Sequence, residues 1–344
     1  MADNSRVILD KNDISTSASK HISRLISAGA VIGNIDDTLT PTGTWGSVAK
    51  ITFKASQLAE KKEKEWVYDN HTVTLNSDEL DFEFEVPFDD DLEANEGEIV
   101  VYNLSSKTLN ALKAIAKNDE HSVCIEAGYK DDTGVIYEGR ITKIDTKRSN
   151  SDKATTIKVT DNIEQRTVNI SFDAGSTAQH ILGKLLDMLS YPIAIFKPVR
   201  DHTYENAETV DDSLMSAIKK YSEVCGVSTF ISRGLIYCCK LKEVDNTSIF
   251  SVRESTGMIG SPNPFVEEGN REEYEDKVEG VTIDMLLQHR MSAGAKIRLI
   301  SDGYSGTYYV KSGSHTFNES ECITNFTAIN KESYKVTEKE EEEE

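Results

Sequence analysis

From Trp45 onward, apolar and polar residues alternate along most of the chain, and this period of two predicts antiparallel β-strands buried on one face. The strictest example is LDFEFEV at 80–86, where four apolar residues alternate with three acidic ones. Comparable segments lie at 46–56, 71–76, 98–104, 121–129, 134–149, 153–162, 276–286, 294–301, 306–317 and 321–330. The chain is therefore expected to be rich in strands.

A helical period replaces this alternation in three short stretches. STAQ at 176–179 has the form of a capping box, and Ile and Leu recur after it at the spacing of a packed helix face. A glycine at the position that often ends a helix, Gly226, follows another such stretch. The predicted elements are a helix capped by Ser105 or Ser106 with Leu109, Leu112 and Ile115 on its apolar side, a helix after 176–179, a helix from Asp212 to Val224, and a hairpin at 227–241 that turns at Arg233 and Gly234.

These elements predict an α+β protein that is mostly β, with a small α/β module inserted between two β regions. The predicted parts are a polar N-terminal arm at 1–45, a first β domain at 46–165, the inserted module at 166–241, a second β domain at 242–330 and a disordered acidic tail at 331–344. The tail is either an interaction segment or a solvated end, and we favour the solvated end.

The chain is strongly acidic, with 59 acidic and 38 basic residues and a formal net charge of −21. Such a surface repels nucleic acid and anionic lipid, so a simple binder of DNA backbones is disfavoured. No run of about 18 apolar residues occurs, and the first residues lack the pattern of a signal peptide. We therefore expect no membrane contact and folding in the cytoplasm of the cell that makes the protein.

Candidate chemistry is sparse. Asp89, Asp90 and Asp91 invite a calcium loop, but the EF-hand spacing is absent and a solvated turn is expected. GYSGT at 303–307 lacks the final glycine of a nucleophile elbow and falls in a predicted hairpin turn. Histidines stand at 21, 71, 121, 180, 202, 289 and 315, and cysteines at 124, 225, 238, 239 and 322.

None of these residues has the spacing of a metal site or a catalytic group. We expect the histidines to be surface or packing residues, and the cysteines to be reduced and packed as small apolar groups, with Cys238 and Cys239 on opposite faces of a strand. The sequence thus predicts no catalytic residue, no cofactor and no metal. Two alternatives stay open: a cell-wall hydrolase and a carbohydrate-binding module.

The phrases VYNLS, AGY and GVIYEGRI, in this order, resemble the first β domain of phage tail baseplate hub proteins. The matching residues are Tyr102, Asn103, Leu104, Ser105, Ala127, Gly128, Tyr129, Gly134, Val135, Ile136, Gly139 and Ile141. The segment from Ser292 to Phe317 is similar to the second β domain of the same family, so the resemblance covers about 46–330.

This resemblance implies two tail-tube-like antiparallel β-barrel domains of the same fold. It also implies a structural hub, not an enzyme: a homotrimeric ring that joins the sixfold tail tube to the threefold tip. The implied partners are the tail tube protein, the tape-measure protein, a tail spike or tip protein and other baseplate proteins. DNA would pass through the ring without specific binding, and Glu83 and Glu85 are candidates to face it. The implied location is the virion tail baseplate, assembled in the host bacterial cytoplasm.

Overall fold

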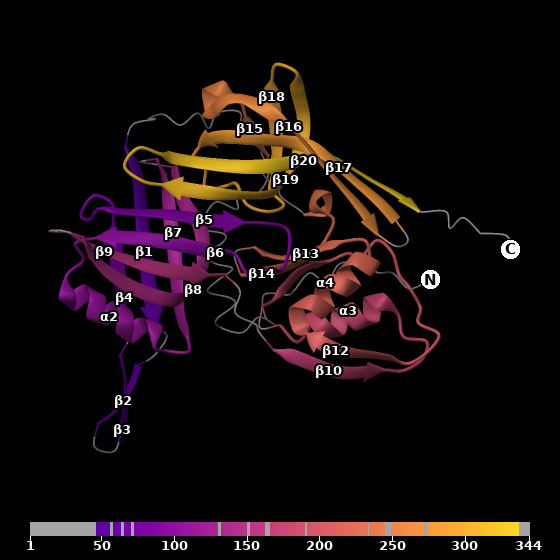
Figure 1. Cartoon of the computed structure of the whole chain (residues 1–344), viewed down its shortest axis with the longest axis horizontal. Coiled ribbons are helices and arrows are strands. Elements are labelled where there is room, and N and C mark those ends of the chain that lie inside the picture. Colours follow the sequence, from indigo (N-terminus) through magenta and orange to yellow (C-terminus); the bar gives the residue numbers. More distant parts are fainter. Residues whose placement is uncertain are drawn as a thin grey trace.

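The computed structural model describes residues 46–55, 58–62, 65–69, 72–129, 132–149, 152–161, 166–189, 191–232, 234–244, 249–271 and 274–336. The arm predicted at 1–45 lies outside these residues, as do positions 337–344. Figure 1 shows two β regions lying against each other and a smaller α/β module packed beside both.

The first region contains seven strands of the main sheet, a separate hairpin and one helix. Its elements are β1 (Ser47–Ala55), β2 (Leu58–Lys62), β3 (Glu65–Asp69), β4 (Thr72–Asn76), β5 (Phe82–Phe88), β6 (Glu96–Tyr102), α2 (Ser106–Ala116), β7 (His121–Tyr129), β8 (Asp132–Ser149) and β9 (Asp152–Thr160). Helix α2 begins after Ser105, whose side chain accepts a hydrogen bond from the amide of Thr108. Leu112 and Ile115 are fully buried beneath it, as their spacing predicted.

The last region is also built from strands. Its elements are β15 (Phe250–Val252), the 3₁₀ turn η2 (Glu254–Thr256), β16 (Met258–Arg271), β17 (Tyr274–Leu286), β18 (Lys296–Ser301), β19 (Tyr304–Phe317) and β20 (Cys322–Val336). Strand β20 continues six residues beyond Asn330, so residues 331–336 belong to a strand and the prediction of a disordered tail from 331 was wrong there. Pairing with β17 as far as Val336 explains the extension.

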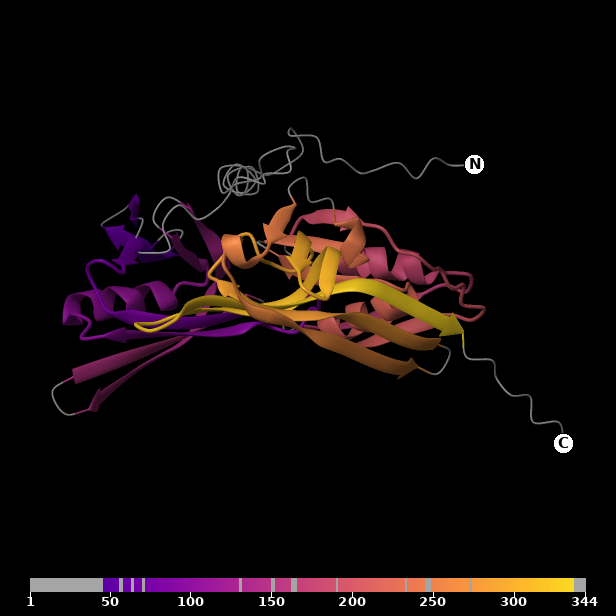
Figure 2. The ribbon, with the colours of Figure 1, turned by 90° about the horizontal axis from the view of Figure 1, so that it is seen from above.

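Thirteen of the described strands form one continuous sheet. Their order is β16-β17-β20-β19-β5-β6-β9-β8-β7-β1-β4, with β18 beside β19 and β15 beside β18. The two regions join where β19 pairs with β5, from Gly313 opposite Phe88 to Phe317 opposite Phe84. The main sheet therefore crosses from one region to the other without a break (Figures 1 and 2).

This pairing differs from the two barrels that were expected. Among the described strands, no pairing closes either region into a barrel. In the first region, β19 occupies the edge of β5 that would have to meet β4, and in the last region the sheet ends at β16, which pairs with β17. The order in which neighbouring strands pair also differs between the two β regions. In the first, β1 pairs with β7, the first strand of the β7-β8-β9 meander, whereas β17 pairs with β20, the last strand of its meander. The prediction of a shared barrel fold is not confirmed.

The inserted module packs two helices beside small sheets. Its elements are β10 (Thr167–Phe172), α3 (Ala178–Leu186), β11 (Ile193–Phe196), β12 (Glu208–Ser213), α4 (Leu214–Val224), β13 (Ser228–Ser232), β14 (Leu235–Cys239) and the 3₁₀ turn η1 (Leu241–Glu243). The cap of α3 is Thr177, one residue later than the predicted capping box, and the side chain of Gln179 donates instead to the carbonyl of Arg200. Gly226 has φ of 70° just past α4, as a helix-ending glycine requires.

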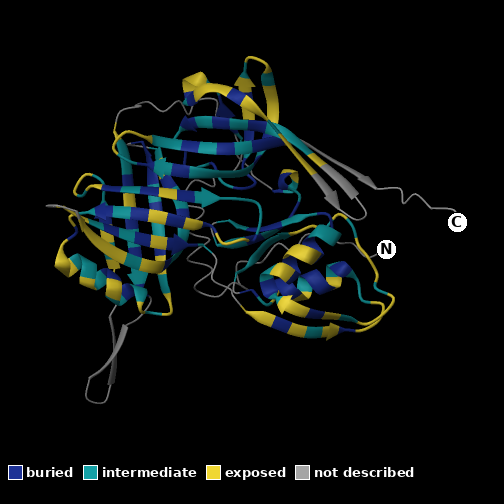
Figure 3. Ribbon diagram, in the orientation of Figure 1, coloured by how far each residue is buried: buried dark blue, intermediate teal, exposed yellow. Residues whose placement is uncertain are grey.

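Buried side chains form four clusters, and alternating burial along the strands is visible in Figure 3. Three clusters belong mainly to the first region, the module and the last region respectively. Three buried side chains cross between them: Leu287 and Phe317 of the last region pack in the first region's cluster, and Leu92 of the first region packs in the module's cluster. The fourth cluster joins Phe230 and Cys239 of the module to Ile329 of the last region.

Candidate functional site: the contacts that join the regions

The residues that carry the hub resemblance build turns and close backbone approaches. Asn103 adopts φ of 52° between β6 and α2, and its side chain bonds the amide of Lys153 and the carboxylate of Asp152. A Cβ atom on Gly128 would lie 2.2 Å from the carbonyl oxygen of Asp132, and one on Gly139 would lie 2.4 Å from that of Thr160. These glycines let neighbouring strands approach more closely than any side chain would allow.

Gly134 makes room for the other region. A Cβ atom there would lie 2.3 Å from Cδ2 of His289, whose ring is almost fully buried against β8. Tyr129, at the end of β7, donates its hydroxyl to the carbonyl of Cys322 at 2.7 Å. Burial and this contact raise the pKa of Tyr129, so the hydroxyl stays protonated and remains a donor. Two residues of the resemblance thus meet the last region directly.

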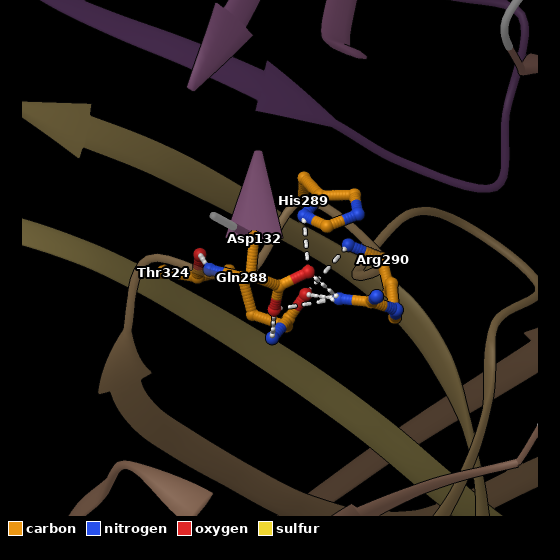
Figure 4. A network of polar contacts seen from close by, with 5 residues as sticks. All are labelled: Asp132, Gln288, His289, Arg290 and Thr324. Carbon is orange, nitrogen blue, oxygen red and sulfur yellow. Dashed lines mark hydrogen bonds and ion pairs between the residues drawn. The ribbon is translucent and has the colours of Figure 1, made fainter. Parts of the chain in front are cut away.

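Asp132 is the centre of the polar network that connects the regions (Figure 4). Nη1 of Arg290 lies 2.7 Å and 2.8 Å from the two carboxylate oxygens of Asp132. The same nitrogen donates to the side-chain oxygen of Gln288 at 2.9 Å, and His289 Nδ1 lies 3.8 Å from Asp132. Asp132 begins β8, whereas the other three residues follow β17, so the contact spans 158 positions of sequence.

Fully buried polar groups hold this loop in place. The hydroxyl of Thr324 accepts from the amide of Gln288 at 3.0 Å. His315 lies 2.9 Å from that hydroxyl through Nδ1 and 3.1 Å from the carbonyl of Met291 through Nε2. Its ring also packs against Phe88 of β5, with centroids 5.0 Å apart. Satisfied buried networks of this kind fix one arrangement of the chain, here that of the loop after β17.

The acidic triplet forms a second joint, and the expectation of a solvated turn was wrong. Asp90 is nearly buried, accepts from Ser228 of the module at 3.1 Å and pairs with Lys311 of β19 at 3.2 Å. Asp89 accepts from the side-chain amide of Asn95, which also donates to Asp161 at 3.0 Å. The triplet therefore lies where all three parts of the molecule meet, a position that local sequence cannot reveal.

Burial changes the protonation of these carboxyl groups. It raises the pKa of Asp89 to about 7, with a further contribution from Asp91, and the pKa of Asp161 to about 6. It also raises that of Asp90, although Lys311 opposes the shift. Burial lowers the pKa of Lys311, but Asp90 and Glu267 outweigh it and the net shift is upward. The 3.2 Å contact favours an ionised Asp90–Lys311 pair at neutral pH.

The residues examined as candidates for chemistry lie in turns and in the buried core. GYSGT lies at the β18–β19 hairpin, where Ser301 pairs with Tyr304 and Gly303 has φ of 84°. Within the described part of the chain, no group of three or more His, Cys, Asp or Glu side chains is arranged to hold a metal ion. Cys238 and Cys239 are both fully buried, in the module's cluster and in the fourth cluster respectively, which confirms their opposite faces. All five cysteines are free.

The sequence profile of a known family matches residues 88–312, well over half of the 344-residue chain, and that family is described as baseplate hub gp41. The chain belongs to this baseplate hub family. The match covers the Tyr-Asn-Leu-Ser turn, Asp132 with its partners at 288–290, and the whole inserted module, so the hub resemblance read from the sequence is confirmed. No curated protein matches the hub chain in a sequence search.

Three solved structures are similar to the hub chain in shape. A tail protein from Neisseria meningitidis MC58 is 8% identical, with 83% of this chain and 97% of that chain covered and a TM-score of 0.49. The 43 kDa tail protein of prophage MuSo2 from Shewanella oneidensis is 6% identical, with 81% and 97% covered and a TM-score of 0.49. The E. coli c3393 protein, a type VI secretion component, is 11% identical, with 73% and 74% covered and a TM-score of 0.46.

Family membership makes this chain a structural component of a phage tail baseplate. As a hub it contacts other baseplate or tail proteins. None of the helices in the described residues has the length and apolar character needed to cross a bilayer. The joints around Asp132 and Asp90 are structural contacts that hold the three parts of the chain together.

Proposed function

We propose that three copies of this chain close a ring at the end of the tail tube and join the sixfold tube to the threefold tip. The observation that carries the proposal is the continuous sheet, which turns two β regions into one wall segment through the β5–β19 pairing. Two β regions per chain would give six in a trimer, matching a sixfold tube. The partners would be the tail tube protein, the tape-measure protein, a spike or tip protein and other baseplate proteins.

The domain boundaries belong to the same proposal. The division at 46–165, 166–241 and 242–330 is supported by the three main buried clusters, which follow it closely. The crossing contacts of Leu92 and Phe317 argue that the parts move as one body in the ring. Both β regions would act as tube-like units although their strands connect in different orders.

We further propose that the hub does no chemistry and that DNA passes through the ring without specific contacts. The net charge of −21 supports this, since an acidic lumen does not hold phosphates. A cell-wall hydrolase or carbohydrate-binding module at the tail tip remains the alternative, and measurable turnover of peptidoglycan by the purified chain would establish it. Assembly in the host bacterial cytoplasm is part of the proposal.

Mass measurement of the purified chain, alone and mixed with the tail tube protein, tests the ring. We expect three copies of this chain for each closed ring of tube subunits. A complex with six copies, or with one, would rule the trimer out. The purified chain alone can be monomeric in this account, because ring closure can wait for the tube.

A further inference from the structure

One row across four strands of the main sheet carries its charges in two blocks. Glu85 of β5 is paired in register with Glu98 of β6. Glu98 is paired in turn with Lys158 of β9, and Lys158 with Lys143 of β8. Residues paired directly across antiparallel strands share a face of the sheet, so these four side chains lie side by side at strand spacings of about 4.8 Å. All four are exposed, and the row consists of two negative charges followed by two positive ones.

The row lies on the face of the sheet that points away from the core. Its neighbours along the strands, among them Phe84, Ile99 and Ile157, are buried on the opposite face, where the apolar side of α2 also packs. Figure 3 shows the alternation of exposed and buried positions along β5 and β6. The charges are therefore presented outward on a sheet face and are not enclosed by the first region's own core.

Charges around the row extend both blocks. Glu83 and Glu96 lie on the same face of β5 and β6 and enlarge the acidic block. On β8, Lys147 enlarges the basic block in the same way. Asp145 lies between Lys147 and Lys143 and contacts Lys143 at 2.6 Å, which removes part of the positive charge. The face is thus acidic over β5 and β6 and basic, on balance, over β8 and β9.

The stability of the chain itself does not account for this order. Like charges at directly opposite cross-strand positions destabilise a sheet, and opposite charges stabilise it. The observed order places only Glu98 and Lys158 as opposite neighbours, whereas alternating signs would make every neighbouring pair favourable. Edge protection explains only Lys143, because β8 leaves β7 after Gly139, while the other three positions have a paired strand on both sides. The grouping is better explained by a partner surface.

We propose that two copies of the free chain bind each other face to face through this row, related by a two-fold axis that runs parallel to the strands. Such an axis reverses the order of the row in the second copy, so each acidic block faces a basic block. The contact is isologous, since the same surface serves both copies. It also keeps the strands of the two sheets aligned, as is common for sheets that pack face to face.

This dimer is a state of the chain before it joins the ring, and the inference goes beyond the proposed function. Glu83 and Glu85, the candidates to face the channel, would be covered in the dimer, which has to open before the ring can form. A nucleic acid fits this face less well. The basic block attracts phosphates, but the acidic block beside it and the net charge of −21 repel them.

Sedimentation velocity over a concentration series tests the association. At about 0.1 M salt the screening length is about 10 Å, so repulsion between the net charges is largely screened while charges in contact still attract. We expect the wild-type mass to rise with concentration from that of one chain, 38.3 kDa, towards that of two. At about 1 M salt the screening length falls to about 3 Å, and the dimer should weaken.

Charge reversal makes the test specific to the row. Lys143→Glu with Lys158→Glu makes the whole row negative, and Glu85→Lys with Glu98→Lys makes it positive. In each variant alone the dissociation constant should rise by roughly a hundredfold or more, because like charges then meet across the axis. Mixed in equal amounts, the two variants should form a heterodimer. The variant with all four changes should dimerise like the wild type, because its row again has two opposite blocks.

Matched controls make the same changes in net charge elsewhere on the surface. Lys107→Glu with Lys113→Glu on α2 matches the negative row, and Asp78→Lys with Asp119→Lys matches the positive row, all at exposed positions. Both controls should dimerise like the wild type. Thermal melting checks that every variant is folded.

A wild-type chain that stays monomeric, or that forms a trimer, at about 0.1 M salt would overturn the inference. So would controls that lose the dimer as fully as the row variants, or a mixture of the two row variants that does not associate. Binding of a short DNA duplex that the negative row abolishes, with no dimer in the wild type, would assign the basic block to nucleic acid instead.

A particle reconstruction separates this inference from the ring. Three copies around the axis would leave the proposed function standing whatever the sedimentation shows. A different copy number would defeat the ring and leave the dimer of the free chain standing.

Discussion

Single residues decide how the β regions meet, and Gly134 and Asp132 are the clearest cases. Gly134 is one of the residues that signalled a hub, yet its role is to leave room for the buried ring of His289. Asp132 gathers Arg290 and Gln288 from the far side of the joint. Both residues stabilise the arrangement of the elements around the joint.

Replacing Gly134 by Ala should destabilise the protein by about 1–3 kcal/mol, because the new methyl group overpacks His289. The double variant with His289→Ala should lose less than the sum of the two single variants, since the removed ring vacates the space. Urea unfolding of the four proteins measures this coupling. Strict additivity would contradict the close contact.

Asp132→Asn should cost about 1–3 kcal/mol in free energy of unfolding, because Arg290 loses a charged partner in a half-buried joint. The matched control is Glu126→Gln, which breaks the exposed Lys50–Glu126 pair and should cost at most about 1 kcal/mol. Equal losses in the two variants would show that the joint is no more than a surface ion pair.

The acidic joint predicts a pH dependence. Because burial raises the pKa of Asp89 to about 7, the folded protein keeps a proton there that the unfolded chain releases at lower pH. The stability that this proton supplies is complete below the unfolded pKa and is lost as pH rises through about 7. Asp89→Asn should therefore flatten the fall in unfolding free energy between about pH 4 and pH 7. The exposed control Asp78→Asn should leave the slope unchanged, and an unchanged slope in Asp89→Asn would refute the assignment.

At the scale of elements, the β5–β19 pairing unites two regions that sequence order keeps apart. Phe317 of β19 stacks on Phe84 of β5, with centroids 5.3 Å apart, and lies 5.9 Å from Phe82. A side chain of the last region therefore completes the core of the first.

Phe317→Ala should destabilise both regions, by about 3–5 kcal/mol, because it removes a large side chain from a shared core. Hydrogen exchange should quicken in β5 as well as β19. Phe326→Ala is the matched control: Phe326 is buried in the last region's cluster, which β5 touches through Phe88 at its end, so this variant should leave residues 82–86 of β5 protected. Faster exchange in β19 alone after Phe317→Ala would contradict a shared core.

The spacing of apolar residues predicted the strands and helices that depend only on local sequence. Strict alternation located β5, and the spacing of Leu112 and Ile115 located α2. Strand β16 was missed because Gly260, Pro262 and Pro264 make its sequence look like a turn. The joints were also missed, because Asp132 and Arg290, or Asp90 and Lys311, are brought together only by pairings between strands distant in sequence.

At the scale of the whole molecule, one sheet runs through both β regions and the module packs beside it. The sheet supplies continuity, and the joints at Asp132 and Asp90 link the two β regions to each other and to the module. Composition gave the net charge of −21, but it could not show that carboxylates such as Asp90 and Asp132 lie in the joints between the parts.

A reconstruction of tail particles that contain this chain tests the central claim most directly. The account predicts three copies around the axis at the end of the tube, their sheets forming an unbroken wall around a channel. A particle with one or six copies around the axis, or with this chain outside the wall, would contradict it.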